Sequence, residues 1–299
     1  MTTQLTVLNM MASSDFDESV SRHAQWGLTW MDLWGEIYGC PSVDLLDEPT
    51  AKRAAATIEQ AGLRVYCLST RIFDGHVEIG EEAFRAEHLG QLKKSLALAA
   101  IVKPSIVRLI AARVTKADVD ANAIELLKAD YPWVANVYRE AVNLIVDAGY
   151  AATIENETTE CILASADEFL DFFAWLDLGD KVTLTWDVQN NWQMGVFPSL
   201  ATYRQLKPLI RYVHLKGGQS NEGSDELAWS VGLADASWPV LEITQAVVDD
   251  DISPVICLNP SHGARKPDYD YGPQSSPRDF FAVTQRDLEF LRTNVKGIV

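Results

Sequence analysis

Eight short apolar runs alternate with longer helical patterns along the 299 residues, at intervals of roughly 35 residues. Apolar, β-branched runs that are bounded by turn residues indicate buried strands. We expect strands over residues 5–10, 29–34, 63–70, 105–111, 150–155, 182–187, 210–216 and 253–258. The intervening patterns predict helices over residues 16–26, 51–61, 81–102, 133–148, 165–176, 199–207, 237–249 and 278–293.

Strict alternation of strands and helices favours a parallel sheet, and eight pairs in this length fit a closed (β/α)8 TIM barrel. An open, doubly wound sheet is the competing arrangement. It is disfavoured because no GxGxxG pattern follows the first strand. No linker, low-complexity tract or change in composition divides the chain, so we expect one domain over residues 1–299.

The chain is strongly acidic, with 25 Lys and Arg against 42 Asp and Glu and a formal net charge of −17. Such a charge opposes binding to nucleic acid and to anionic membranes. No apolar run is long enough to cross a bilayer, and the N-terminus has no basic leader, so we expect a soluble, cytoplasmic protein. The four cysteines form no CxxC pair, and Cys67 and Cys257 are expected to be reduced core residues.

Three consecutive expected strands end in side chains that can bind a metal. Glu155 and Asp187 each follow an apolar run, and His214 follows the next. The carboxyl ends of parallel strands share one face of a barrel, so these side chains would meet at one mouth. Carboxylates together with an imidazole suit Mn²⁺, Mg²⁺, Co²⁺ or Zn²⁺. The alternative is that each is an isolated capping or loop residue, which three positions in register disfavour.

The residues around these positions resemble a known family. A Trp-Asp-x-x-Asn element contains Asp187, and a His-x-Lys element contains His214 and Lys216. Both are similar to motifs of the sugar-phosphate isomerase/epimerase superfamily, the xylose-isomerase-like TIM barrels. Residues 234–239 also resemble the Gly-Asp-x-x-Trp element of that group. The resemblance implies a barrel of the xylose-isomerase type and an activity on sugars or sugar derivatives.

The resemblance also implies one divalent metal ion, with Mn²⁺ expected first and Mg²⁺, Co²⁺ or Zn²⁺ as alternatives. Members of the family bind it through Glu, Asp, His and a second Glu on the eighth strand. Carried over, the ligands are Glu155, Asp187 and His214, with Asn259 at the fourth position. An amide oxygen can bind a hard cation but cannot accept a proton as a carboxylate does. The substitution therefore removes one of the two glutamate bases that epimerases of this family use.

Further polar residues near the strand ends are candidates for the chemistry. We expect the catalytic residues to be Glu155, Lys216 and His262. An equally good interpretation is that Lys216 forms a structural ion pair and that His262 is a solvated loop residue. Arg108 interrupts an apolar strand and must be paired, and we favour a carboxylate in the barrel over a substrate oxygen as its partner. The expected substrate contacts are Trp34, Arg108, Glu157, Gln189 and Asn191.

These observations favour a metal-dependent enzyme that removes a proton next to the carbonyl of a sugar, ketose or keto-sugar derivative, in the manner of an isomerase or epimerase. One alternative is a lyase or dehydratase, including the large subunit of enzymes that cleave 3-keto C-glycosides with a small partner subunit. Another is a sugar-binding or partner subunit without turnover. The endonuclease branch of the family is disfavoured because five scattered histidines and the net charge do not suit it. The resemblance also implies a homo-oligomer.

Overall fold

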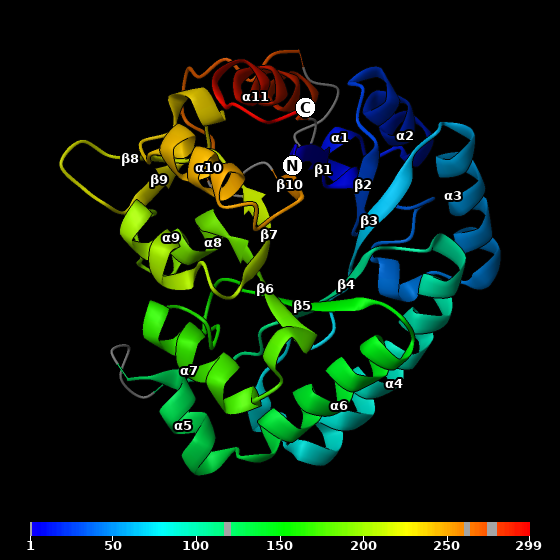
Figure 1. Ribbon diagram of the computed structural model, residues 1–299, viewed down its shortest axis with the longest axis vertical. Helices are drawn as coiled ribbons and strands as arrows, with labels where there is room; N and C mark the ends of the chain where they lie inside the picture. Colours follow the sequence, from blue (N-terminus) through cyan, green and yellow to red (C-terminus); the bar gives the residue numbers. More distant parts are fainter. Residues whose placement is uncertain (1, 117–120, 260–263, 274–279) are drawn as a thin grey trace.

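Eight parallel strands form the centre of the structure, in the order β1-β10-β7-β6-β5-β4-β3-β2 (Figure 1). The computed structural model describes residues 2–116, 121–259, 264–273 and 280–299. The strands are β1 (Gln4–Val7), β2 (Trp30–Leu33), β3 (Arg64–Ser69), β4 (Ile106–Ile110), β5 (Ala151–Glu155), β6 (Val182–Asp187), β7 (Ile210–Leu215) and β10 (Val255–Leu258).

The two end strands of this order, β1 and β2, meet and close the sheet. Leu8 and Asp32 form a parallel bridge just beyond β1, and the Thr6 hydroxyl donates to the Trp30 carbonyl at 2.7 Å. The order of the strands and this contact establish a (β/α)8 barrel, as the alternation in the sequence predicts. The open, doubly wound sheet is excluded.

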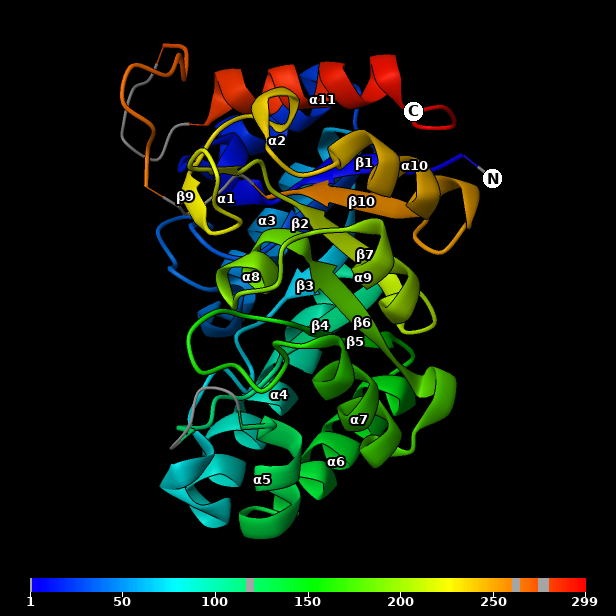
Figure 2. The same cartoon turned by 90° about the vertical axis from the view of Figure 1, so that its left-hand side faces the viewer.

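Helices surround the strands on the outside of the barrel (Figures 1 and 2). None of the described helices is both long enough and apolar enough to span a membrane. Their bounds are α1 (Asn9–Ala12), α2 (Phe16–Gln25), α3 (Glu48–Gln60), α4 (Glu81–Val102), α5 (Ala123–Asp130), α6 (Trp133–Asp147), α7 (Ala166–Leu176), α8 (Val188–Gln193), α9 (Leu200–Leu206), α10 (Val240–Asp249) and α11 (Phe281–Asn294).

The helix ends follow local signals in the sequence. The Asp47 side chain accepts a hydrogen bond from the Thr50 N–H at 2.8 Å, which caps α3. Ser165 and Glu168 form a capping box at the start of α7. Gly62 and Gly149 follow α3 and α6 with φ values of 75° and 89°, a left-handed conformation that glycine adopts without strain.

The structure differs from the sequence prediction mainly in the loops. The first strand ends at Val7, because Asn9–Ala12 forms the short helix α1. A short antiparallel pair, β8 (Gln219–Ser220) and β9 (Leu227–Trp229), lies in a segment that we expected to be irregular. The helix expected from residue 278 begins at Phe281, and residues 274–279 lie outside the described part.

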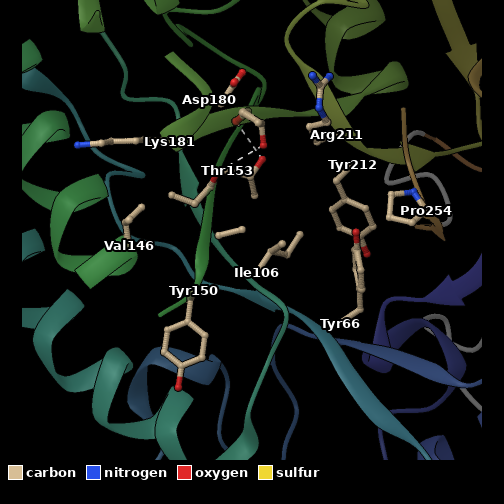
Figure 3. Close-up of a pocket in the computed structure, with 13 residues that line it drawn as sticks. Tyr66, Ile106, Val146, Tyr150, Thr153, Asp180, Lys181, Arg211, Tyr212 and Pro254 are labelled. Carbon is tan, nitrogen blue, oxygen red and sulfur yellow. Dashed lines mark hydrogen bonds between the residues drawn. The ribbon is translucent and has the colours of Figure 1, made fainter. Parts of the chain in front are cut away.

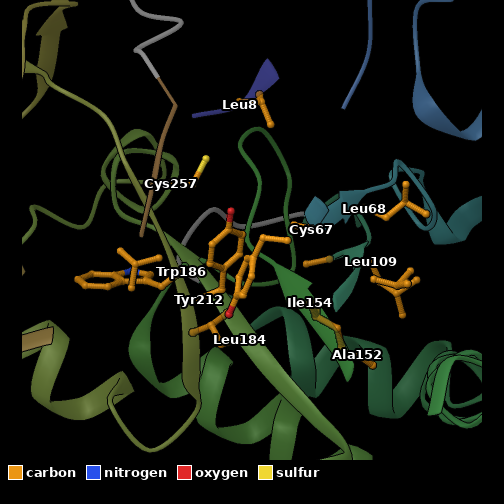
Figure 4. Packing of buried hydrophobic residues seen from close by; sticks show 14 of the residues in the cluster. Leu8, Cys67, Leu68, Leu109, Ala152, Ile154, Leu184, Trp186, Tyr212 and Cys257 are labelled. Atoms are coloured by element: carbon orange, nitrogen blue, oxygen red, sulfur yellow. The ribbon is translucent and has the colours of Figure 1, made fainter. Parts of the chain in front are cut away.

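The barrel strands are almost entirely buried, and their side chains form one continuous apolar core with the helices (Figure 4). Cys67 and Cys257 are free thiols with no exposed surface, which confirms their expected place in the core. Tyr138 on α6 is fully buried in this layer and brings a polar group to the strands. Its hydroxyl accepts from the Ala112 N–H at 2.8 Å and donates to the Ile110 carbonyl at 2.7 Å. Tyr138 therefore holds the chain where it leaves β4.

Replacing Tyr138 with Phe should lower the free energy of unfolding by about 1–3 kcal/mol, because two buried backbone groups lose their partner. Urea denaturation of the two proteins measures this difference. Tyr150→Phe is the matched control, because the half-buried Tyr150 makes no hydrogen bond to a described residue through its hydroxyl. Equal stabilities of Tyr138→Phe and the control would contradict the claim that the Tyr138 hydroxyl stabilises the backbone after β4.

Candidate active site

Four ionisable side chains converge at the carboxyl ends of the strands. Glu155 and Asp187 are the last residues of β5 and β6, and His214 lies one residue before the end of β7. Asp187 and His214 are register partners on neighbouring strands. Asp32 on β2 approaches the same histidine from the other side. All four side chains are 1% exposed or less.

The imidazole of His214 lies between the carboxylates. Its Nδ1 is 2.8 Å from Glu155 Oε1 and 3.9 Å from Asp187 Oδ2. Its Nε2 is 3.3 Å from Asp32 Oδ2. The Asp32 carboxylate is itself held by the hydroxyls of Ser69 and Tyr212, the latter at 2.8 Å. Asp32 therefore has the place of an outer carboxylate that orients a histidine ligand.

Two buried cations balance part of this negative charge. The Arg108 guanidinium on β4 contacts Glu155 Oε2 and donates to the Thr70 carbonyl at 3.1 Å. Lys216 Nζ lies 2.8 Å from Asp187 Oδ2 and donates to Asn190 Oδ1 at 2.8 Å. Both cations are 2% exposed. The partner that a charge in the middle of β4 requires is thus a carboxylate of the barrel.

The expected metal ligands fit a cation. Glu155, Asp187 and His214 each offer one ligand atom within 4.8 Å of the other two. Asp187 Oδ2 lies 2.8 Å from Lys216 Nζ and His214 Nδ1 lies 2.8 Å from Glu155 Oε1, whereas the buried Asn259 Oδ1 has no hydrogen-bond partner among the described residues. Buried polar atoms are nearly always satisfied, and a bound ion is one reason for exceptions. Asn259 follows β10, and its N–H donates to the Leu215 carbonyl at 3.0 Å.

Glu157 stands at the edge of this cluster. It is only partly buried, and its Oε2 lies 3.4 Å from Asn190 Nδ2. Burial and the nearby charge of Glu155 raise the pKa of Glu157 to about 7. Burial also raises the pKa of Glu155, but Arg108 and His214 outweigh that effect and lower it to about 2. The two glutamates thus differ in accessibility and in charge at neutral pH.

Protons and a metal ion are alternative ways to balance the site. Asp32, Glu155, Glu157 and Asp187 carry four negative charges when ionised, against two positive charges on the cations. Burial lowers the pKa of His214, but Glu155 and Asp32 beside the ring raise it to about 9. Protons on His214 and Glu157 therefore supply the two missing positive charges. One divalent ion supplies the same charge, and its binding releases protons from its ligands.

A short helix after β6 decides where two expected substrate contacts lie. Asp187 Oδ1 accepts from the N–H groups of Gln189 and Asn190 and thereby caps α8. We expected an extended segment, in which Gln189 and Asn191 would share a face. On the helix, the Gln189 amide donates to the Gly217 carbonyl at 2.7 Å, and the Asn191 amide donates to the Ala164 carbonyl. Both side chains are buried.

Three site residues were not singled out from the sequence. Asp32 interrupts an apolar strand, which is the signal that drew attention to Arg108. Asn190 belongs to the Trp-Asp-x-x-Asn motif and binds Lys216. Asn156 exchanges two hydrogen bonds of 2.9 Å with the backbone of Asp187. Together they fix the positions of the ionisable groups.

One expected substrate contact follows β2, and one expected catalytic residue lies outside the described residues. Trp34 follows β2, two residues past Asp32, and is half-buried. Its N–H donates to Asn9 Oδ1 at 2.8 Å. His262 lies outside the described residues, so its expected catalytic role stays a prediction.

No protein-family model and no curated protein sequence matches the chain. Solved structures do match, and one is D-psicose 3-epimerase in the presence of D-fructose, with a TM-score of 0.71, 14% identity and 99% of both chains covered. Another is the probable 3-DHS dehydratase involved in petrobactin synthesis from Bacillus anthracis, with a TM-score of 0.68, 16% identity, and 98% of this chain and 99% of that chain covered.

A third is the apo form of 3-keto-D-glucoside 4-epimerase from E. coli, with a TM-score of 0.66, 14% identity, and 97% of this chain and 99% of that chain covered. Further matches include a sugar phosphate isomerase/epimerase and a xylose isomerase domain protein. At these identities the likeness establishes the fold. It is the xylose-isomerase-like barrel that the resemblance of the motifs implies.

Replacing Arg108 with Met should destabilise the protein by about 3–5 kcal/mol, because Glu155 then keeps a buried charge without its main partner. Arg286→Met is the control, since Arg286 and its partner Asp270 are exposed and such pairs contribute about 1 kcal/mol or less. Denaturant titration at neutral pH compares the two variants with the parent protein. A loss no larger than that of the control would contradict the pairing.

Proposed function

We propose that this chain is a divalent-metal-dependent enzyme that removes a proton next to a carbonyl in a sugar, ketose or keto-sugar derivative. The observation that carries the proposal is the buried set of ligand atoms on Glu155, Asp187 and His214, which lie within 4.8 Å of one another, and the Asn259 amide oxygen is buried without a hydrogen-bond partner among the described residues. The names of the similar structures, two epimerases and a dehydratase, support it. Epimerisation and dehydration beside a carbonyl can both begin with the removal of a proton.

Glu155, Asp187 and His214 would hold the metal, and the Asn259 amide oxygen is the fourth candidate ligand. Carboxylate, amide and imidazole donors suit Mn²⁺, which we propose first, and also Mg²⁺, Co²⁺ or Zn²⁺. A bound divalent ion supplies Lewis-acid polarisation of a carbonyl oxygen. Asp32 would keep the His214 ring oriented for this purpose.

The proton is best carried by Glu157. Glu155 is buried, and its two oxygens face Arg108 and His214, so it has little freedom to reach a substrate carbon. Glu157 is partly exposed, and among the described residues its carboxylate has one long hydrogen bond, from Asn190. Lys216 could donate a hydrogen bond to a substrate oxygen if the Asp187 carboxylate binds the metal ion in place of Lys216. His262 remains a second candidate for proton transfer.

The residue after the eighth barrel strand bears on the type of reaction. Asn259 cannot serve as the second base that a symmetrical epimerase mechanism uses. This favours an isomerase, or a lyase that expels a leaving group β to the carbonyl, over a two-base epimerase. The same residue supports the other candidate, a sugar-binding subunit without turnover. A homo-oligomeric state, a small partner subunit and a cytoplasmic location also stay predictions.

The protein loaded with Mn²⁺ and then desalted should retain about one metal ion per chain, as measured by mass spectrometry. Glu155→Gln should retain much less, because a ligand charge is lost. Glu160→Gln is the matched control, since Glu160 is exposed and lies five residues further along the chain. Equal metal content in Glu155→Gln and the control would contradict the proposed ligand set.

A second variant tests the metal site independently, in case Glu155→Gln does not fold. Asp32→Asn keeps the shape of the side chain that orients His214, and it should weaken Mn²⁺ binding by roughly 10–100-fold. Melting curves establish that each variant is folded. Metal binding by folded Asp32→Asn that equals the parent protein would remove Asp32 from the site.

Ketoses and 3-keto-glycosides incubated with the metal-loaded protein in D₂O should gain deuterium at the carbon next to the carbonyl. NMR spectroscopy follows the exchange. Glu157→Gln should slow it by about 100-fold or more while the metal content is unchanged. The absence of exchange in every keto-sugar, with metal bound, would exclude the enzyme and favour the binding subunit.

A further inference from the structure

The opposite end of the barrel contains a pocket of about 630 Å³ (Figure 3). It is lined by residues at the starts of the strands, including Ile106 of β4, Ala151 of β5 and Arg211 of β7, so it faces away from the ionisable cluster. Pockets of this size hold small organic molecules. The amino-terminal end of such a barrel ordinarily contributes to stability, so an open pocket there requires an explanation.

The walls of the pocket are chiefly apolar and aromatic. The rings of Tyr66 and Tyr212 lie on one wall, with centroids 5.0 Å apart. Tyr150 adds a third aromatic ring, and Ile106, Val146 and Pro254 are among the aliphatic lining residues. Aromatic rings and aliphatic side chains favour a flat apolar molecule, because aromatic faces bury much area in fixed orientations.

One polar group on this wall is accessible from the pocket. The residue Tyr66 is 7% exposed, and its hydroxyl oxygen is not fully buried and has no hydrogen-bond partner among the described residues. The Thr153 hydroxyl, in contrast, lies 2.8 Å from the Thr185 hydroxyl and 3.1 Å from the Thr183 carbonyl. The Tyr66 hydroxyl is therefore available to donate to an acceptor on a ligand.

The edge of the pocket carries two cations and one carboxylate, Lys181, Arg211 and Asp180 (Figure 3). All three are exposed, and within the described part of the chain the Arg211 guanidinium donates only to the Ile210 carbonyl, at 2.6 Å. Neither cation has an ion-pair partner among the described residues. In a chain of net charge −17, an edge with a positive excess is a local exception. An anionic group would meet it favourably.

We propose that this pocket binds a flat, largely apolar carboxylate. Its ring system would lie against Tyr66 and Tyr212, and its carboxylate would reach Arg211 and Lys181 at the edge. The proposal is independent of the function assigned to the other end of the barrel. Tyr212 touches both ends, because its hydroxyl holds Asp32, so it is unsuitable for a test of the pocket alone.

Isothermal titration calorimetry with 2-naphthoate tests the proposal on the full chain, with neutral 2-naphthamide as the uncharged probe. Naphthoate should bind more tightly than the amide. Arg211→Gln should weaken naphthoate binding by about 10-fold, which corresponds to ~1.4 kcal/mol, and leave the amide unaffected. Arg204→Gln is the control, because Arg204 is also exposed but does not line the pocket. Equal affinities for the two probes, or no binding at millimolar concentration, would overturn the proposal.

The location is tested by filling the pocket. Ala151 is exposed at the start of β5 and lines the pocket, so Ala151→Trp should abolish binding of both probes. A melting curve checks that this variant folds, and the surface variant Arg211→Gln gives an independent result. Undiminished binding by folded Ala151→Trp would place the probe elsewhere. A change of oligomeric state in Ala151→Trp, seen by gel filtration, would show that a second copy covers the pocket.

Discussion

The buried contact between Arg108 and Glu155 is the interaction on which the rest of the site depends. An ionised carboxylate in the interior is costly unless it is paired and hydrogen-bonded, and β4 supplies the pair from the neighbouring strand. With one Glu155 oxygen held in this way, the other faces His214, and the ring in turn faces Asp32. The side chains of Arg108, Glu155, His214 and Asp32 thus form a continuous chain of polar contacts from β4 through β5 and β7 to β2. The closure of the barrel between β1 and β2 brings the last of them into place.

Under the proposed function, this arrangement would separate the residues that hold a metal from the residue that moves a proton. Glu155 and Asp187 are buried, are contacted by cations and belong to strands, so they have the rigidity that ligands require. Glu157 lies beyond the strand and is partly exposed, as a group that exchanges protons with a substrate must be. Asn259 would place an uncharged ligand where the proposed reaction lacks a second base. A single accessible carboxylate accounts for one-sided proton transfer, as in isomerisation or elimination, more directly than for exchange on both faces of a carbon.

The barrel and the convergence of Glu155, Asp187 and His214 could be predicted because strand ends are visible in the sequence and the topology brings them to one face. Asp32 was passed over because it lies inside an apolar run and not at a strand end, although a charge within such a run is the signal that marked Arg108. The backbone partners of the Gln189 and Asn191 side chains could not be predicted, because they depend on the helix that the side chain of Asp187 starts. The pocket at the other end depends on which inward side chains leave space unfilled. Periodicity carries no information about that.

The most direct test of the account is anomalous diffraction from a crystal of the protein grown with Mn²⁺. The account predicts one strong peak within bonding distance of Glu155, Asp187 and His214, with the Asn259 amide turned toward it. Lys216 should then have moved from Asp187 Oδ2, from which its Nζ lies 2.8 Å in the computed structure. A well-ordered site without a peak, in which Lys216 still contacts Asp187, would contradict the central claim that these residues form a metal centre.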